Sequence, residues 1–145
     1  MENPNHIGEA RIRVRYAETD QMGVVYHANY IVWFEVGRVE FLRKLGFEYR
    51  LMEQEDDCHI AVAEVRCRFK APARYDDQIL VRTRIKFLRG PLIQFAYEVL
   101  HEPRGTMLAE GESTHMVVNS RFERTTLPTK YAEAFERVLT EQNGE

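Results

Sequence analysis

The chain of 145 residues fits a single domain, since domains most often contain about 100–150 residues. Hydrophobic residues make up 44% and charged residues 30%, which excludes a disordered chain. The net charge of −3 argues against bulk electrostatic binding of nucleic acid. No apolar run approaches the ~18 residues of a membrane span, and the start lacks a signal peptide's apolar core. Cys58 and Cys67 fit a reducing compartment, so we expect a cytoplasmic protein.

The first predicted element is a strand over residues 10–16. Ala10, Ile12, Val14 and Tyr16 alternate with arginines along it. Apolar side chains at every second position indicate a strand with one buried face.

A long helix is predicted next, over residues 30–45. Its apolar stripe recurs at three- and four-residue spacing and contains Tyr30, Phe34, Gly37, Phe41 and Leu45. Asn29 is the expected N-cap and Gly46 the expected stop. Gly37 lies within the stripe, which indicates close packing of the helix against a sheet. A short helical turn is expected over residues 51–55.

Four further strands are predicted by the same alternation, at residues 61–71, 79–87, 93–99 and 107–119. Ala109, Gly111 and Ser113 are small residues on one face of the last strand, where something bulky can approach the sheet. A terminal helix follows Pro128. Short links between the later strands favour antiparallel neighbours. We find no repeat or linker, so residues 1–145 are predicted to form one α+β domain, an antiparallel sheet wrapped around one helix.

Residues 16–30, between the first strand and the helix, contain the chemically interesting groups. A helix start offers unpaired N–H groups and a positive dipole end, which can polarise a carbonyl. Asp20 could fold back to that point as a nucleophile or general base, because Gly23 permits a close turn. The alternative is that Asp20 only forms a turn, Asn29 only caps the helix, and His27 is an ordinary polar residue.

The motif TDQMGVVYHANY at residues 19–30, followed by Trp33-Phe34-Glu35 and Arg38, bears on this choice. It resembles the signature of the 4-hydroxybenzoyl-CoA thioesterase branch of the hotdog-fold family. That branch includes the Tol–Pal-associated, YbgC-type bacterial acyl-CoA thioesterases. The resemblance implies a hotdog fold, with a five-stranded antiparallel sheet wrapped around one long central helix. It also implies a hydrolase of acyl-CoA thioesters.

The resemblance assigns roles to individual residues. It implies that Asp20 attacks the thioester carbon or activates water, and that the backbone N–H of His27 stabilises the oxyanion. Several relatives carry Tyr at the His27 position, so an obligatory imidazole is not implied. Gly23 and Tyr26 would shape the substrate loop. Tyr30 is a candidate for lining the acyl pocket, either aromatic or short aliphatic.

The resemblance also bears on coenzyme A and on assembly. Relatives bind the CoA phosphates with basic residues after the third strand and beyond the fifth, where this chain has Arg89, Arg121 and Arg124. Coenzyme A is part of the substrate, so no separate cofactor is implied. The family forms dimers or tetramers with active sites between subunits, and we therefore expect a homo-oligomer, with a homotetramer as one form.

Other chemistries receive less support from the residues. Asp20, His27 and Glu35 match no compact metal-binding motif, so we expect no metal. Cys67 lies on the apolar side of a predicted strand, where a thiol acts as a small hydrophobic group. His115 has inward parity and is expected to be a hydrogen-bonded core histidine.

The alternative function is that of a non-catalytic binding module. Basic residues occupy the outward parity of the first three strands: Arg11, Arg13, Arg15, Arg66, Arg68, Lys70, Arg82, Arg84 and Lys86. If these strands were neighbours, they would form a face for nucleic acid or an acidic protein. The face lacks the interleaved aromatic residues used for base stacking, and acids on later strands would offset its charge, so we expect no nucleic-acid partner.

Overall fold

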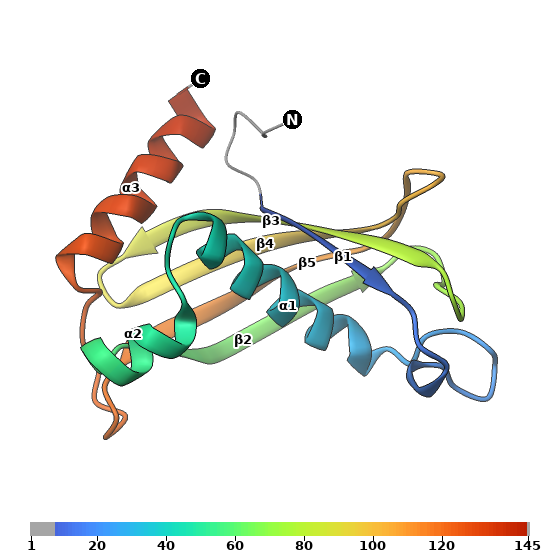
Figure 1. Ribbon diagram of the computed structural model, residues 1–145, viewed down its shortest axis with the longest axis horizontal. Helices are drawn as coiled ribbons and strands as arrows, with labels where there is room; N and C mark the ends of the chain where they lie inside the picture. Colours follow the sequence, from blue (N-terminus) through green and yellow to red (C-terminus); the bar gives the residue numbers. More distant parts are fainter. Residues whose placement is uncertain (1–7, 145) are drawn as a thin grey trace.

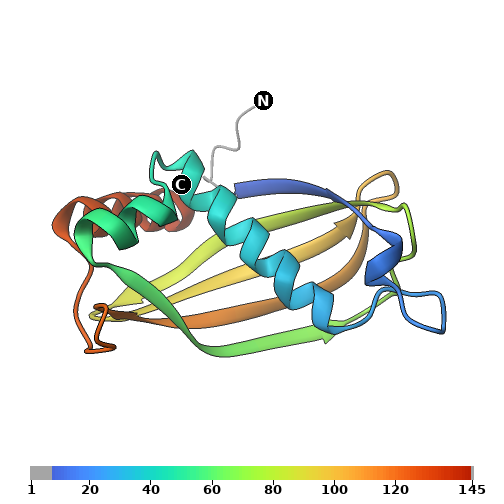
Figure 2. The same ribbon diagram turned by 60° about the horizontal axis from the view of Figure 1, so that its bottom comes forward.

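A long helix lies along one face of an antiparallel sheet that bends around it, as Figures 1 and 2 show. The computed structural model describes residues 8–144. Its elements are β1 (Gly8–Arg13), a 3₁₀ turn (Tyr16–Glu18), α1 (Ala28–Lys44), α2 (Tyr49–Asp56), β2 (His59–Phe69), β3 (Gln78–Arg89), β4 (Leu92–His101), β5 (Thr106–Val118) and α3 (Thr129–Gly144). The predicted α+β architecture, with five strands around one helix, is confirmed. No helix in the described part of the chain is long and apolar enough to cross a membrane.

The strands are ordered β1-β3-β4-β5-β2, and every neighbouring pair is antiparallel. β3, β4 and β5 are sequential hairpins, as their short links predict. β2 pairs with β5 and not with β3, so the link at residues 70–77 crosses the end of the sheet. The two edges are therefore β1 and β2, and β2 is the longer edge.

The interface between α1 and the sheet depends on small residues at two points. Phe34 is fully buried and stacks on Tyr97, with ring centroids 4.3 Å apart. A Cβ on Gly111 would lie 3.0 Å from the Phe34 ring, and a Cβ on Gly37 would collide with Thr83. Both glycines thus allow the close approach of helix and sheet that was predicted from their positions.

The first strand is shorter than predicted. It ends at Arg13, and Tyr16 lies in the 3₁₀ turn with 77% of its surface exposed, so the inward position predicted for Tyr16 is wrong. The backbone leaves β3 because Val14 accepts a hydrogen bond from the N–H of Asp76 and donates one to the carbonyl of Asp77. The β2–β3 link therefore decides where this strand ends.

β2 departs from the predicted alternation because its register with β5 shifts between Val62 and Glu64. Ile60 is buried before the shift, whereas Ala63 is exposed, so the alternation predicted for residues 61–71, which would turn Ala63 inward, is wrong at this point. An edge strand also has a partner on one side only. Phe69, at its end, is 52% exposed.

α1 begins one residue earlier than its predicted cap. Ala28 is the first helical residue and His27 occupies the cap position without a side-chain cap bond, so the prediction of Asn29 as N-cap is wrong. The Asn29 amide instead donates to the carbonyl of Glu18, at 2.9 Å. The predicted end is confirmed, because the helix stops at Lys44 and Gly46 has a φ of +94°.

α2 and α3 pack together at the end of the sheet opposite the start of α1 (Figure 1). The Tyr131 hydroxyl of α3 donates a hydrogen bond to Asp56 of α2, and its ring meets Phe47 edge to face at 4.7 Å. Phe135 contacts Phe95 on the inner face of the sheet. This end is therefore closed by helices, and the other end by loops.

Candidate functional site

Asp20 lies in a tight turn ahead of α1. Its Oδ1 accepts a hydrogen bond from the N–H of Met22 at 2.9 Å and a longer one from Val24 at 3.4 Å. The backbone of Asp20 is bonded to Val24 and Gly23. Its Oδ2 has no hydrogen-bond partner among the residues that the structure describes. One oxygen of this half-buried carboxylate therefore forms the turn, and the other is available for chemistry.

Gly23 makes this turn possible. Its φ of +80° lies in the left-handed region, which side-chain-bearing residues rarely adopt. A Cβ at this position would meet nothing within 4 Å, so the glycine is needed for its backbone angle and not for space. The turn predicted from Gly23 is confirmed, and its contact with substrate stays a prediction.

A buried carboxylate that the sequence analysis overlooked supports the Asp20 turn. Glu18 is 5% exposed and accepts hydrogen bonds from the N–H of Arg15 at 2.8 Å and from Nε1 of Trp33 at 3.2 Å. Its carbonyl accepts from the N–H of Tyr26 and from the Asn29 amide. Glu18 thus joins both ends of the loop to α1. A Glu three residues after the cap position, as in one half of a capping box, is the signal that could have revealed it.

The start of α1 offers two backbone donors. No acceptor for the N–H groups of His27 or Ala28 is found among residues 8–144, as expected for the first turn of a helix. The His27 side chain is exposed, and its ring packs against Tyr26 at 4.4 Å and Phe69 at 6.3 Å. No hydrogen bond joins the side chains of His27 and Asp20 within that range. The positive end of the helix dipole and the two unpaired N–H donors therefore lie at the same point, the start of α1.

Tyr30 lies deeper than the other loop residues. It is 3% exposed, and its ring meets Phe69 edge to face at 5.2 Å and Trp33 at 4.9 Å. Burial raises the pKa of its hydroxyl, which therefore stays protonated. Asp20, Gly23, Tyr26, His27 and Tyr30 are thus brought together at one end of α1.

The three arginines predicted to bind CoA lie at the opposite end. Arg89 ends β3, whose twelve residues span roughly 40 Å at about 3.3 Å each, and its guanidinium lies 4.5 Å from the Phe87 ring centroid. Arg124 follows β5 and pairs with Val118, and the exposed Arg121 lies near Glu123. One chain therefore does not bring these arginines to Asp20, and their role stays a prediction.

Metal ligands and reactive thiols are not assembled in the described residues. Residues 8–144 contain no group of three or more His, Cys, Asp or Glu side chains able to hold a metal ion. Burial raises the pKa of the Cys67 thiol to about 11, and the pKa of Cys58 likewise. Both thiols are protonated at neutral pH, which does not favour a cysteine nucleophile.

A chain of hydrogen bonds crosses the interior from α1 to β5. Arg38 Nη1 donates to the Tyr97 hydroxyl at 3.2 Å. The Tyr97 hydroxyl lies 2.5 Å from Ser113 Oγ, and this Oγ lies 2.7 Å from His115 Nε2. His115 is fully buried, and burial lowers its pKa to about 3. The predicted core position of His115 is confirmed.

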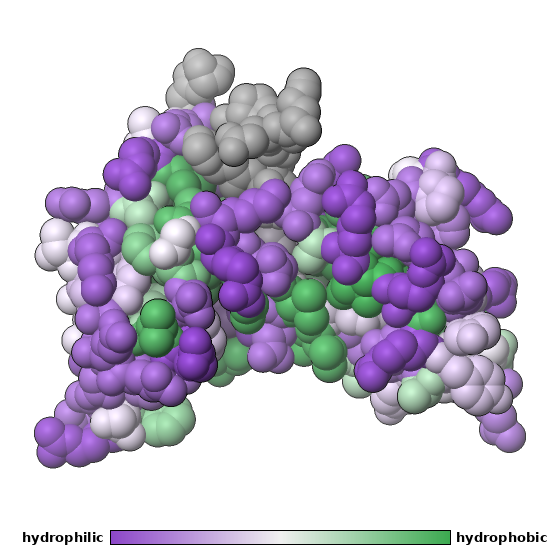
Figure 3. Space-filling model, viewed as in Figure 1, coloured by the Kyte–Doolittle hydropathy of each residue, from purple (hydrophilic) through white to green (hydrophobic). Residues whose placement is uncertain are grey.

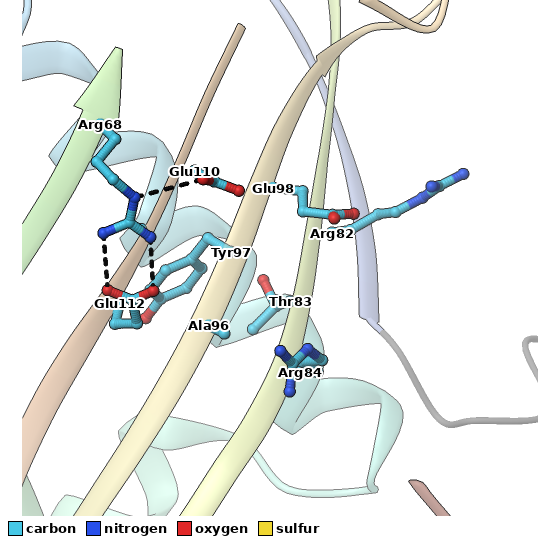
Figure 4. A pocket seen from close by; sticks show the side chains of 10 residues that line it. Arg68, Arg82, Thr83, Arg84, Ala96, Tyr97, Glu98, Glu110 and Glu112 are labelled. Atoms are coloured by element: carbon cyan, nitrogen blue, oxygen red, sulfur yellow. Dashed lines mark hydrogen bonds and ion pairs between the residues drawn. The ribbon is translucent and has the colours of Figure 1, made fainter. Parts of the chain in front are cut away.

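The outer face of the sheet carries acids among its bases. Figure 4 shows Arg68 reaching Glu110 and Glu112, with distances of 3.4 and 2.8 Å. Glu98 lies on β4 between Arg82 of β3 and Glu110 of β5. Because β4 and β5 separate β2 from the neighbouring strands β1 and β3, the three basic strands do not form one continuous basic surface, and the face offers little support for the binding-module alternative.

Comparison with known proteins agrees with the fold and identifies the family. The sequence matches the thioesterase-like superfamily over residues 14–135. It is 36% identical over 130 residues to the putative acyl-CoA thioesterase YneP of Bacillus subtilis (strain 168), covering 90% of this chain and 91% of that protein. It is 35% identical over 101 residues to the acyl-CoA thioester hydrolase YbgC of Escherichia coli O6:H1, covering 70% of this chain and 74% of YbgC.

A solved structure shows the same arrangement of elements. The DHNA-CoA thioesterase of Staphylococcus aureus superimposes with a TM-score of 0.90 and 29% identity, covering 96% of this chain and 95% of that one. The family match covers most of the chain, and the site residues at the start of α1 lie within it. The chain therefore belongs to the thioesterase-like superfamily.

Proposed function

We propose that this protein hydrolyses acyl-CoA thioesters to a free acid and coenzyme A, with Asp20 as the reacting carboxylate. The observation that carries the proposal is the state of Asp20, whose Oδ1 is fixed by turn amides while Oδ2 has no partner among the described residues. The relatives named as acyl-CoA thioesterases support this substrate class.

The reaction has two possible first steps at Asp20. As a general base, Oδ2 takes a proton from water, whose oxygen attacks the thioester carbon; the C–S bond then breaks and the CoA thiolate receives a proton. As a nucleophile, Oδ2 attacks the same carbon and expels the thiolate, and water then hydrolyses the mixed anhydride. In both routes the negative charge develops on the carbonyl oxygen.

The start of α1 is suited to stabilising that charge. Backbone N–H groups at a helix N-terminus donate hydrogen bonds to an oxyanion, and the helix dipole adds a favourable field. We assign this role to the N–H of His27. The exposed His27 ring would then act as a wall of the site beside Tyr26, without a required proton transfer.

We propose that two copies of the chain pair along β2. An edge strand has unpaired backbone groups, and apolar side chains are exposed around this edge. They lie on α1 and β2: Ile31, Val32, Val36, Val62 and Phe69. Figure 3 shows apolar patches among charged groups on the face that carries α1.

Antiparallel pairing of two β2 edges would also explain the position of the arginines. It would bring the end of one subunit that carries Arg89, Arg121 and Arg124 toward the Asp20 end of the other. CoA would then bind across the interface, with its phosphates on one subunit and its thioester on the other. We propose that the reaction takes place in the cytoplasm, without a metal or a separate cofactor.

The test is hydrolysis of a panel of acyl-CoA substrates, with released thiol measured by Ellman's reagent. Asp20→Asn is the sharpest variant, because an Asn side-chain oxygen still accepts the N–H of Met22 and preserves the turn. We expect kcat to fall by about 10³-fold or more with an unchanged melting temperature. Asp76→Asn, in the adjoining link, is the matched control and should retain activity.

A wild-type protein that hydrolyses no acyl-CoA faster than buffer would overturn the proposal, as would a fully active Asp20→Asn variant. A single turnover in ¹⁸O water then separates the two routes. The general-base route places the label only in the product acid. An anhydride opened at the Asp20 carbonyl places the label in Asp20.

A further inference from the structure

A second part of α1, away from its start, faces a small cleft. The cleft lies between α1, α2, β2 and β4, and its cavity volume is about 30 Å³, enough for the end of a ligand and not for a whole one. Its apolar walls include Leu42, Ile60 and Phe95. Its polar side chains are Glu35, Arg38 and Tyr49. Apolar walls with a few convergent polar groups are the usual lining of a small-molecule site, and at this size the cleft can receive one terminal group of a ligand.

Arg38 is the unusual member of this lining. A guanidinium carries several N–H donors, yet Arg38 has one hydrogen-bond acceptor within residues 8–144, the Tyr97 hydroxyl. No carboxylate in that range forms an ion pair with it, although Glu35 precedes it by three residues on the same helix. The N–H donors of a half-buried guanidinium need acceptors, and Tyr97 supplies only one of them.

The chain of hydrogen bonds behind Arg38 supplies no further acceptor. Arg38 can only donate, so the Tyr97 hydroxyl accepts from it and must donate its own proton to Ser113. Ser113 in turn donates to Nε2 of His115, which is therefore neutral with its proton on Nδ1. Each hydroxyl thus accepts one hydrogen bond and donates its own proton to the next group. The chain holds the guanidinium from behind, and its remaining donors are left for the cleft.

Arg38 also stands in a defined relation to the start of α1. It follows His27 by eleven residues, which is about three helical turns and roughly 16 Å along the same face. Ile31 lies between them on that face and is partly exposed. Long helical side chains lean toward the N-terminus, so the reach shortens to roughly 10–15 Å. That is the length of an extended acyl chain of roughly eight to twelve carbons.

We propose that this cleft receives the distal end of the acyl group, and that Arg38 selects acyl chains that carry a hydroxyl there. The hydroxyl oxygen accepts from Arg38 and its proton is donated to Glu35, so one group satisfies both side chains. The Glu35 carboxylate disfavours a distal carboxylate. The inference rests on the proposed thioesterase function and adds a substrate class and a specificity-determining residue.

The test compares kcat/KM for decanoyl-CoA, 10-hydroxydecanoyl-CoA and 9-carboxynonanoyl-CoA. We expect the wild-type protein to prefer the hydroxylated chain over decanoyl by about 10- to 100-fold, the size of one hydrogen bond to a charged group. In Arg38→Met this ratio should fall to about one. Arg43→Met, on the exposed side of the same helix, is the control and should keep the wild-type ratio.

Binding of the free acids provides a readout that needs no turnover. By isothermal titration, 10-hydroxydecanoic acid should bind the wild-type protein more tightly than decanoic acid, and this difference should vanish in Arg38→Met. A purely structural role for Arg38 would weaken both ligands equally. Equal wild-type kcat/KM values, equal wild-type affinities, or an unchanged preference in Arg38→Met would overturn the inference.

Failure of the two proposals would look different. If no acyl-CoA is hydrolysed, the thioesterase function fails, and the acid-binding difference still decides whether the cleft selects a hydroxyl. If acyl-CoA is hydrolysed with no dependence on the distal group, the thioesterase function stands and the role of Arg38 fails.

Discussion

The two ends of the sheet hold their candidate functional residues in different ways. At the Asp20 end, the loop is tied to α1 by the buried Glu18 and to the β2–β3 link by the bond from Val25 to Ala73. At the other end, the loop after β5 is held by Asn119, which accepts from the N–H of Arg121, and the arginine side chain extends into solvent. A reacting carboxylate needs a fixed position, whereas a phosphate can be bound by a long side chain at the surface.

The largest expected effect comes from removing the anchor at the Asp20 end. Glu18→Ala leaves the buried Trp33 Nε1–H without its acceptor, so we expect the free energy of unfolding to fall by about 3 kcal/mol and kcat to fall with it. Glu123→Ala, in the opposite loop, should change it by less than about 0.5 kcal/mol. Urea denaturation of both variants checks this. Equal losses would remove the contrast between the two ends.

The interior between the two ends should make the protein sensitive to acid. The folded-state pKa of His115, about 3, lies below its unfolded value of about 6.5, so the unfolded state binds the extra proton. The stabilisation is therefore present above pH 6.5 and is lost as the pH falls toward 3. Between pH 7 and 5 we expect a loss of about 2 kcal/mol, measured by denaturation.

His115→Gln should remove this part of the pH dependence, because glutamine does not titrate. An identical slope in wild type and His115→Gln would show that His115 does not cause the acid sensitivity.

The arginine end should affect substrate binding more than stability. The double substitution of Arg121 and Arg124 by Ala is expected to raise KM for acyl-CoA by about 3- to 10-fold, because each charge-assisted bond to a phosphate is exposed to solvent and salt. The melting temperature should not change. Steady-state kinetics is measured with acyl-CoA and with an acyl-pantetheine that lacks the nucleotide. The double substitution should raise KM only for the acyl-CoA substrate.

The smallest effect is expected where the helices close that same end. Tyr131→Phe removes the hydrogen bond to Asp56 and keeps the ring contact with Phe47. We expect the melting temperature to fall by about 2–5 °C with unchanged kcat. A drop in kcat would mean that this end communicates with Asp20 through the fold.

The sequence predicted the parts of this structure that depend on local patterns. Alternation revealed every strand, and the turn residues around Gly23 and Gly46 were recognisable because their backbone angles are a local property. The end of β1 and the shift in β2 depend on hydrogen bonds to segments roughly 50–60 residues away, which no local pattern reports. The predicted cap at Asn29 failed because its side chain donates to the carbonyl of Glu18, in a loop whose path local patterns do not report either.

The site was predictable to a similar extent. Asp20 and His27 are near each other in the chain, so the motif was sufficient to single them out. Glu18 was missed because its importance lies in being buried against Trp33. The cleft at Arg38 was not foreseeable, since its walls come from α1, α2, β2 and β4.

The close contact at Gly37 fixes the position of α1 along the sheet. A Cβ at this position would strike Thr83, so the middle of the helix is seated in one position along the sheet and cannot slide. The spacing between its start and Arg38 is then a constant of the backbone. Inserting one turn between Ile31 and Gly37 would lengthen that spacing by about 5 Å and shift the favoured acyl chain by roughly four carbons. The preferred acyl chain length would thus depend on the number of helical turns between the start of α1 and Arg38.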